Sequence, residues 1–399
     1  MKYIVEKISS LGRFLFLPFL FIASFVFAMF QGGFLSWFLF YSFLPFAFYS
    51  VLVIFYPLKS IQVKRVLKQK EYMANNEVQV DVIIQRNNRF PLLFLLIEDR
   101  LPAAFLKKNN SQKRFVYLMF QKKLTYTYTI QQAVRGEHQF RAFTIMTGDL
   151  LGFYTKKQEI ACVNTLLVYP LYKRMLSEQF SVLFEQGLRA ALFKQQEVTS
   201  IVSSVRPYIP GDRLTSIHWK ATARKNEIMT KDFDVQNSQD VCILLDQNPS
   251  KSFENLVRLV ASLTDAALFK GIRVSFIGTH STLSSVTFGK GESQRRKVLY
   301  ELAKIQEAEE SKHTFSTIYR KNGNAVYVLV TSWLRAEMIS SLSTLKEKNT
   351  VMIFLLVQDG LLVSEQEKLV MKVKSNGIPC RMLESATWTN VDKEGIYHA

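Results

Sequence analysis

One long part of this chain lacks charge. No Asp, Glu, Lys or Arg occurs in residues 14–58, where phenylalanine dominates. A bilayer core of ~30 Å requires ~20 apolar residues per helix, so the run is long enough to cross twice. Gln31, Gly32 and Gly33 interrupt it, which predicts an N-terminal transmembrane helical hairpin with helices at about 14–30 and 34–56. The run is too long for the apolar core of a cleaved signal peptide.

Cysteine and histidine are scarce. The chain has 3 Cys and 5 His, and Cys162, Cys242 and Cys380 form no C-x-x-C pair. This number and spacing argue against a disulfide framework or a zinc site, and they favour reduced core thiols. The sequence also lacks an H-x-x-x-H pair, a G-x-S-x-G elbow and a G-x-x-x-x-G-K phosphate loop. We therefore expect a binding protein rather than an enzyme.

Acidic residues are outnumbered, since 51 Lys and Arg against 33 Asp and Glu give a formal net charge of +18. Cations flank the uncharged run on both sides: Lys2, Lys7 and Arg13 before it, and Lys59, Lys64, Arg65, Lys68 and Lys70 after it. The positive-inside rule then predicts a cell-membrane protein with both termini and its soluble domains in the cytoplasm. Residues 59–71 are expected to be a basic juxtamembrane linker beside the anionic leaflet. No recognised motif combines a Lys/Arg stripe with stacking aromatics, so nucleic acid is not the expected partner.

The soluble part changes its hydrophobic pattern along the chain. Residues 72–170 contain short segments of alternating or β-rich composition at roughly ten-residue spacing, which predicts a β-sandwich. Residues 171–239 are expected to be a connector. From residue 240 to 399, apolar strand-like runs alternate with helical stretches such as 253–269 and 364–374. That alternation predicts a C-terminal doubly wound α/β domain.

The connector contains the densest motif, RPYIPGDRLTSIHWKATAR at residues 206–224. Its prolines and Gly211 favour a turn, and the alternation after Ser216 favours a half-buried strand or an ordered loop. Three interpretations remain open. In the first, Asp212 accepts hydrogen bonds from nearby backbone or pairs with Arg206 or Arg224, and Trp219 is a packing anchor. In the second, the motif forms a partner-binding surface, and in the third, Asp212 and His218 perform acid–base chemistry. The candidate residues are Arg206, Tyr208, Gly211, Asp212, His218, Trp219, Lys220 and Arg224.

This motif resembles the signature of the bacterial family called domain of unknown function 58, R-x-Y-x-P-G-D-x-x-R-x-I-x-W-K-x-x-A-R. Thr215 replaces the central Arg, and Arg213 lies two residues away. The resemblance implies a membrane-anchored protein with a von Willebrand factor A-like α/β domain. It also implies partners, because relatives commonly accompany AAA+ ATPases of the MoxR type and a membrane-bound transglutaminase-like protein.

The end of the first α/β strand carries a second candidate site. Asp246, Asn248 and Ser250 are similar to the D-x-S-x-S loop of von Willebrand factor A domains, which holds Mg²⁺. The strand at 327–330 ends in Thr331 and Ser332, without the carboxylate of that metal site. Two interpretations remain open: Asp246 caps the helix that begins near Ser252, or the loop holds Mg²⁺ with help from a partner.

These patterns together predict a membrane-tethered, non-catalytic cytosolic adaptor or scaffold. Its expected partners are the lipid bilayer and a protein such as a MoxR-type AAA+ ATPase. The alternative is a divalent-metal-dependent enzyme that acts at the inner face of the membrane.

Overall fold

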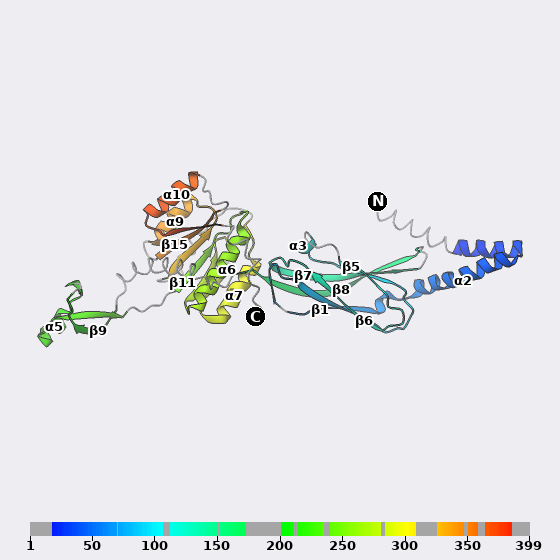
Figure 1. Ribbon diagram of the computed structural model, residues 1–399, viewed down its shortest axis with the longest axis horizontal. Helices are drawn as coiled ribbons and strands as arrows, with labels where there is room; N and C mark the ends of the chain where they lie inside the picture. The colour runs from blue at the N-terminus through cyan, green and yellow to red at the C-terminus, as the bar shows by residue number, and fades with distance from the viewer. Residues whose placement is uncertain are drawn as a thin grey trace. The chain divides into compact units, whose positions relative to one another are not determined.

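The computed structural model describes thirteen stretches of the chain: residues 18–69, 71–106, 112–149, 152, 154–172, 201–210, 212, 214–234, 240–280, 284–308, 325–346, 350–357 and 364–384. They belong to two compact units, Met1–Val168 and Tyr169–Ala399. Figure 1 shows the elements of each unit.

The N-terminal unit begins with apolar helices. Helix α2, Phe34–Phe55, has a mean hydropathy of 2.1 and is, among the described residues, the one helix long and apolar enough to cross a membrane. A shorter apolar helix covers Pro18–Gln31, and residues 14–17 of the expected first helix lie outside the described residues. Gly32 adopts a φ of 61°, a left-handed conformation that glycine allows at the turn between the helices.

In the part of this unit that the structure describes, eight strands follow in two antiparallel sheets of order β1-β3-β6 and β2-β8-β7-β4-β5. The strands are β1 Ile61–Leu67, β2 Glu71–Met73, β3 Val78–Arg86, β4 Leu95–Asp99, β5 Gln112–Val116, β6 Lys123–Ile130, β7 Gly136–Gly148 and β8 Thr155–Tyr169, with short helices η1 Leu58–Ser60 and α3 Ala103–Leu106. Burial alternates along β3, as expected for a strand with one face in a core.

The basic stretch 59–71 is not a linker, which corrects the expectation from sequence. Most of it is β1, which pairs with β3 from Ile61↔Arg86 to Leu67↔Val80. Burial alternates along β1, so Ile61, Val63 and Arg65 point inward while Lys64 points outward. The cations concealed this alternation in the sequence, because a buried arginine is rare unless it is paired.

Arg65 makes that pairing. Its guanidinium bonds both oxygens of Asp99 on β4, at 3.0 and 2.5 Å, and donates to the carbonyl of Cys162 on β8. Its Cζ atom lies 4.5 and 4.4 Å from the ring centroids of Phe140 and Phe143. Both charged side chains are inaccessible to solvent, at 0% and 1% exposure. The pair therefore connects the two sheets through the centre of the sandwich.

The C-terminal unit contains a β-hairpin region and a six-stranded sheet of order β13-β12-β11-β14-β15-β16. The hairpin elements are β9 Ile201–Pro207, η2 Leu214–Ser216, α5 Trp219–Lys225 and β10 Met229–Asp234. The others are β11 Asp240–Leu245, α6 Phe253–Phe269, β12 Arg273–Gly278, β13 Ser285–Gly289, α7 Gly291–Lys304, β14 Val326–Thr331, α9 Ala336–Lys346, β15 Thr350–Val357, α10 Ser364–Ser375 and β16 Cys380–Glu384.

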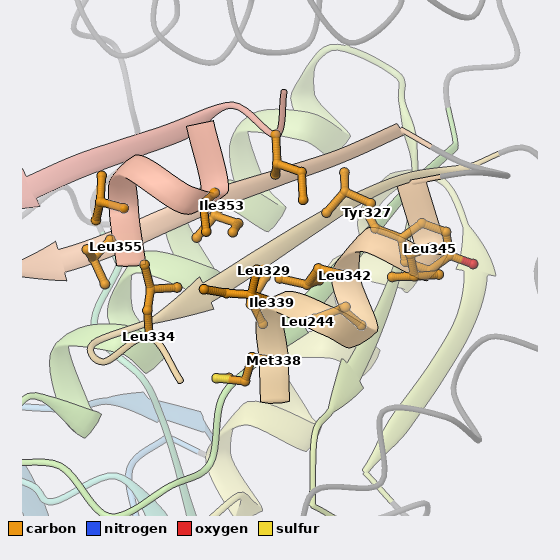
Figure 2. Packing of buried hydrophobic residues seen from close by; sticks show 14 of the residues in the cluster. Leu244, Tyr327, Leu329, Leu334, Met338, Ile339, Leu342, Leu345, Ile353 and Leu355 are labelled. Carbon is orange, nitrogen blue, oxygen red and sulfur yellow. The ribbon is translucent and has the colours of Figure 1, made fainter. Parts of the chain in front are cut away.

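All sheet neighbours in the six-stranded sheet are parallel except β13, which pairs antiparallel with β12 at one edge. Helices α6 and α7 cover one face, and α9 and α10 cover the other (Figure 1). Figure 2 shows the core under α9, where Leu329 and Ile353 of the sheet pack with Leu342 of the helix. The strand order reverses between β12 and β14 around β11, so the carboxyl ends of β11 and β14 form the position where such sheets place ligands.

We expect Asp99→Ala to lower the free energy of unfolding of the N-terminal unit by about 3–5 kcal/mol, because it leaves a buried guanidinium without its counter-charge. The exposed pair between Arg100 and Glu159 supplies the control, and Arg100→Ala should cost no more than about 1 kcal/mol. Denaturant unfolding of both variants measures the difference. Equal losses would show that the buried pair has no special role.

Candidate functional site

The motif at 206–224 lies on a hairpin that carries its own hydrogen-bonded frame. Strands β9 and β10 pair antiparallel from Met229↔Pro207 to Asp234↔Ile201. The amide of Tyr208 donates to the carbonyl of Ile228 at 2.8 Å and continues the ladder toward the turn. Ile217 bridges to Thr230, which closes the connection over the two strands. Ile217 and Met229 are buried, so the hairpin has a small apolar centre.

Asp212 is part of this frame. Its carboxylate accepts two hydrogen bonds from the Arg206 guanidinium, both at 2.9 Å, and one from the amide of Ile209 at 3.1 Å. These bonds, with the Arg206 pair contributing most, hold the pKa of Asp212 below its ordinary value. Asp212 therefore stays ionised at neutral pH and ties the turn to β9. Of the two pairings that the sequence allowed, the structure places Arg206 on Asp212. Gly211 lies outside the described residues.

His218 also supports the backbone. It is the N-cap of α5, and its Nδ1 accepts a hydrogen bond from the amide of Ala221 at 3.0 Å. Thr222 adds a link to β10, because its hydroxyl accepts from the amide of Met229. The alternation after Ser216 predicted a half-buried strand or an ordered loop, but residues from Trp219 onward form a helix. The cap, two alanines and a left-handed Asn226 at the C-terminus explain the helix locally.

Three of the remaining candidate residues of the motif face solvent, whereas Tyr208 is half-buried. Trp219 is 70% exposed, so it does not pack in a core, and Lys220 and Arg224 are exposed on the same short helix. Four large apolar side chains of the hairpin are exposed: Ile209, Leu214, Trp219 and Ile228. We call these four residues, with Lys220, Arg224 and Lys225, the hairpin face. The motif thus divides into polar groups that hold the backbone and aromatic, aliphatic and cationic groups that remain available.

The second candidate, the Asp246 loop, lies at the switch point of the six-stranded sheet. Asp246 is almost fully buried at the end of β11, and its amide donates to Val330 of β14 at 3.0 Å. Its Oδ2 accepts from the Thr331 hydroxyl at 2.6 Å, and its Oδ1 accepts from the amide and the side-chain nitrogen of Asn248. Ser250 accepts from the Ser332 hydroxyl at 2.8 Å. The loop therefore closes on the end of β14 through hydrogen bonds.

These contacts do not fit a Mg²⁺ site. The loop cluster supplies a single carboxylate, Asp246, which already accepts from Thr331 and Asn248, so Mg²⁺ would have to take most of the oxygen ligands of its octahedral shell from elsewhere. The Arg335 guanidinium lies 3.4 Å from the side-chain oxygen of Asn248 and adds positive charge. Within the described residues, no group of three or more His, Cys, Asp or Glu could hold a metal. Asp246 does not cap α6 either, because its partners are Asn248 and Thr331, and it fixes the loop instead.

The sequence did not predict which residues contact the Asp246 loop. In the structure these are Thr331, Ser332 and Arg335. Thr331 and Ser332 attracted attention only because they replace an expected carboxylate. Their contact with Asp246 and Ser250 follows from the adjacency of β11 and β14 in the sheet. A sequence pattern indicates each strand end, but the strand order decides which ends meet.

We expect Asp246→Asn to lower the free energy of unfolding by about 1–3 kcal/mol, because the amide keeps only one acceptor oxygen and its NH2 group then faces a donor of either Thr331 or Asn248. Thr331→Val removes the other contact and should act in the same direction. Millimolar Mg²⁺ should leave the melting temperature of the wild type unchanged relative to EDTA. A Mg²⁺-dependent increase in the wild type that Asp246→Asn abolishes would establish a metal site and contradict this assignment.

Comparisons with known proteins agree with the motif. The family model described as "Protein of unknown function DUF58" matches residues 204–360. A Bacillus subtilis (strain 168) protein described as "Uncharacterized protein YeaD" is 35% identical over 284 residues, which cover 70% of this chain and 71% of that protein. Among solved structures, the match to a CARDB domain from Pyrococcus furiosus covers 27% of this chain and 86% of that domain, at 8% sequence identity and a TM-score of 0.20. The match to BslA, a bacterial hydrophobin, covers 29% of this chain and 100% of that chain, at 15% identity and a TM-score of 0.20. On the extent of its match to YeaD and the position of its motif, the chain belongs to the DUF58 family.

Proposed function

We propose that this chain is a membrane-tethered adaptor whose hairpin face binds an acidic surface of a protein partner. The observation that carries the proposal is the 70% exposure of Trp219 beside Lys220 and Arg224. Trp and Arg are the residue types that contribute most to binding energy at protein interfaces. An exposed indole costs solubility, so a frame that holds it outward favours a role in contact with another molecule.

The division of the motif supports binding over catalysis. Acid–base work by Asp212 and His218 requires groups that are free to exchange a proton with a substrate. Asp212 is held ionised by Arg206, and Nδ1 of His218 accepts a backbone amide. Both groups therefore act in the frame, and the hairpin face supplies hydrophobic and cationic contacts.

The partner class is taken from the family resemblance. Relatives accompany MoxR-type AAA+ ATPases, and an ATPase of this type with an acidic docking surface would complement the cations of the hairpin face. The six-stranded sheet, with helices on both faces and one antiparallel edge strand, agrees with the von Willebrand factor A-like domain that the resemblance implies. In this proposal the adaptor brings the ATPase to the membrane.

The proposed tether is a helical hairpin with both ends in the cytoplasm. Phe40 of α2 lies 5.4 and 5.6 Å, between ring centroids, from Phe21 and Phe25 of the preceding helix. This packing supports two adjacent helices that enter and leave the bilayer together. Lys59, Lys64 and Lys68 are exposed after α2, and exposed cations next to a span favour the cytoplasmic side.

The alternative, a divalent-metal-dependent enzyme at the inner face of the membrane, needs a metal-binding loop. The loop that the sequence offered for this role is the Asp246 loop, which supplies one carboxylate and lies within 3.4 Å of the Arg335 guanidinium. No contact of the described residues favours this alternative over the adaptor.

We expect Trp219→Ala to weaken binding of the ATPase partner at least about 30-fold, because hot-spot residues contribute 2 kcal/mol or more. Arg224→Ala should weaken it less and reduce its salt dependence. Quantitative mass spectrometry of complexes from gently solubilised membranes identifies the partner, and titration of the purified pair measures the affinity.

Matched controls come from exposed residues of the same unit that lie outside the hairpin face. Phe269→Ala removes an aromatic ring that is 81% exposed, and Arg296→Ala removes an exposed cation. Both should bind as the wild type does. Unchanged ATPase binding by a folded Trp219→Ala variant, or an equal loss with Phe269→Ala, would refute the hairpin face as the binding surface.

Membrane topology has a separate test. Protease added to sealed inside-out vesicles should digest the part of the chain after residue 59, because we place it in the cytoplasm. Protease added to intact spheroplasts should leave the same part undigested. The opposite pattern would show the reverse orientation and would refute the proposal of a cytosolic adaptor.

A further inference from the structure

The last two turns of α2 are fixed to one end of the sandwich. The Tyr49 hydroxyl accepts a hydrogen bond from the amide of Leu93, and the Ser50 hydroxyl donates to Asp149. The Lys156 ammonium donates to the carbonyls of Ile54 and Tyr56, at 3.4 and 3.0 Å, where the helix ends. The loop around residues 90–93, together with Asp149 and Lys156 at the facing ends of β7 and β8, therefore lies beside the point where α2 would leave a bilayer.

A second loop belongs to the same end. The buried Arg86 guanidinium donates to the carbonyls of Phe90, Met119 and Gln121, and Leu92 forms a bridge with Met119. Phe90 in turn stacks on Tyr56 at 4.9 Å between ring centroids. Arg86 thus fixes the loop after β5 next to the loop that contacts α2.

This second loop exposes apolar side chains where a water-facing strand end would carry polar ones. Val116 and Leu118 are buried, while the alternate residues Phe115, Tyr117 and Met119 are exposed. Phe120 follows them and is 59% exposed.

Cations surround these apolar residues without nearby acids in the sequence. Arg89, Lys122 and Lys123 are exposed, and no Asp or Glu occurs in residues 82–97 or 112–136. Aromatic side chains with flanking Lys and Arg are the composition of surfaces that lie in a lipid headgroup layer. We call Phe115, Tyr117, Met119, Phe120, Arg89, Lys122 and Lys123 the membrane-facing patch.

We infer that the membrane-facing patch docks on the anionic leaflet of the bilayer that holds α2, with Met119 and Phe120 in the interface and the cations on lipid phosphates. The inference rests on the proposed tether, because the contacts of α2 with the sandwich are what place the patch at the leaflet. Docking would add a second membrane contact to the helical hairpin and would limit the orientation of the sandwich relative to the membrane.

The test uses the full chain in nanodiscs of zwitterionic lipid alone or with added phosphatidylglycerol. Hydrogen exchange followed by mass spectrometry reports on residues 112–130 without a label. We expect exchange in this segment to be slower with phosphatidylglycerol. Each cation near an anionic leaflet favours the docked state by about fivefold, so Lys123→Glu should reduce the difference between the two lipids at least about fivefold.

Lys68→Glu is the matched control. Lys68 is an exposed cation just beyond the far end of β1, about 20 Å from its start at Ile61 by the rise of an extended strand. It should leave the lipid dependence of residues 112–130 unchanged. Phe120→Ser removes an apolar side chain from the interface, so the variant should dissociate from the leaflet faster than the wild type. Exchange in residues 112–130 should therefore be faster than in the wild type in both lipids.

The outcomes separate this inference from the proposed tether. Carbonate extraction that removes the chain from membranes would refute the tether and this inference together. A chain that stays inserted, with α2 protected but residues 112–130 indifferent to phosphatidylglycerol, would refute the docking alone. Protection that appears in detergent and grows with protein concentration would assign the patch to a second copy of the chain and overturn the inference.

Discussion

The paired charges of Arg65 and Asp99 are the interaction on which the N-terminal unit depends. A guanidinium has five donors, and here they reach a carboxylate on β4 and a carbonyl on β8 while two phenylalanine rings cover its faces. Tyr128 of β6 donates to the same carboxylate, so the first sheet contributes two groups and the second supplies their partners. Burial and the charge of Asp99 raise the pKa of Tyr128, which keeps this phenol a donor at any physiological pH. Correct register of both sheets is required before all of these bonds can form.

The hairpin of β9 and β10 is stabilised differently, because it buries too few apolar side chains to form a core of its own. Polar side chains replace the missing core: Arg206 with Asp212 at the turn, and His218 with Thr222 at the helix. The sequence identified this motif and its individual residues. It could not distinguish the residues that hold the backbone from the exposed residues of the hairpin face. Trp219 illustrates the difficulty, since an indole is equally compatible with a core and with an interface, and only its 70% exposure separates the two.

Regular elements with strong patterns were predictable from sequence. Helix α6 begins and ends at the expected residues 253 and 269, and the apolar strands β11, β14 and β15 lie where continuous hydrophobic runs indicated buried parallel strands. Strand β1 was missed because five cations dominate residues 59–70, and the edge strand β13 was missed because it is short and half exposed. The Asp246 loop shows a further limit: its hydrogen bonds depend on residues 85 positions apart that the sheet order brings together.

The bond of Lys156 to the end of α2 has a mechanical consequence. A helix that ends in a flexible linker can change its tilt freely when bilayer thickness changes. Here an ammonium on β8 holds the last carbonyls, and Ser50 and Tyr49 hold the turn before them. These contacts therefore couple the orientation of the helix to that of the sandwich. In a bilayer, a few degrees of tilt within the hydrocarbon would become a displacement of the whole sandwich, so lipid thickness would set the height of this unit above the membrane.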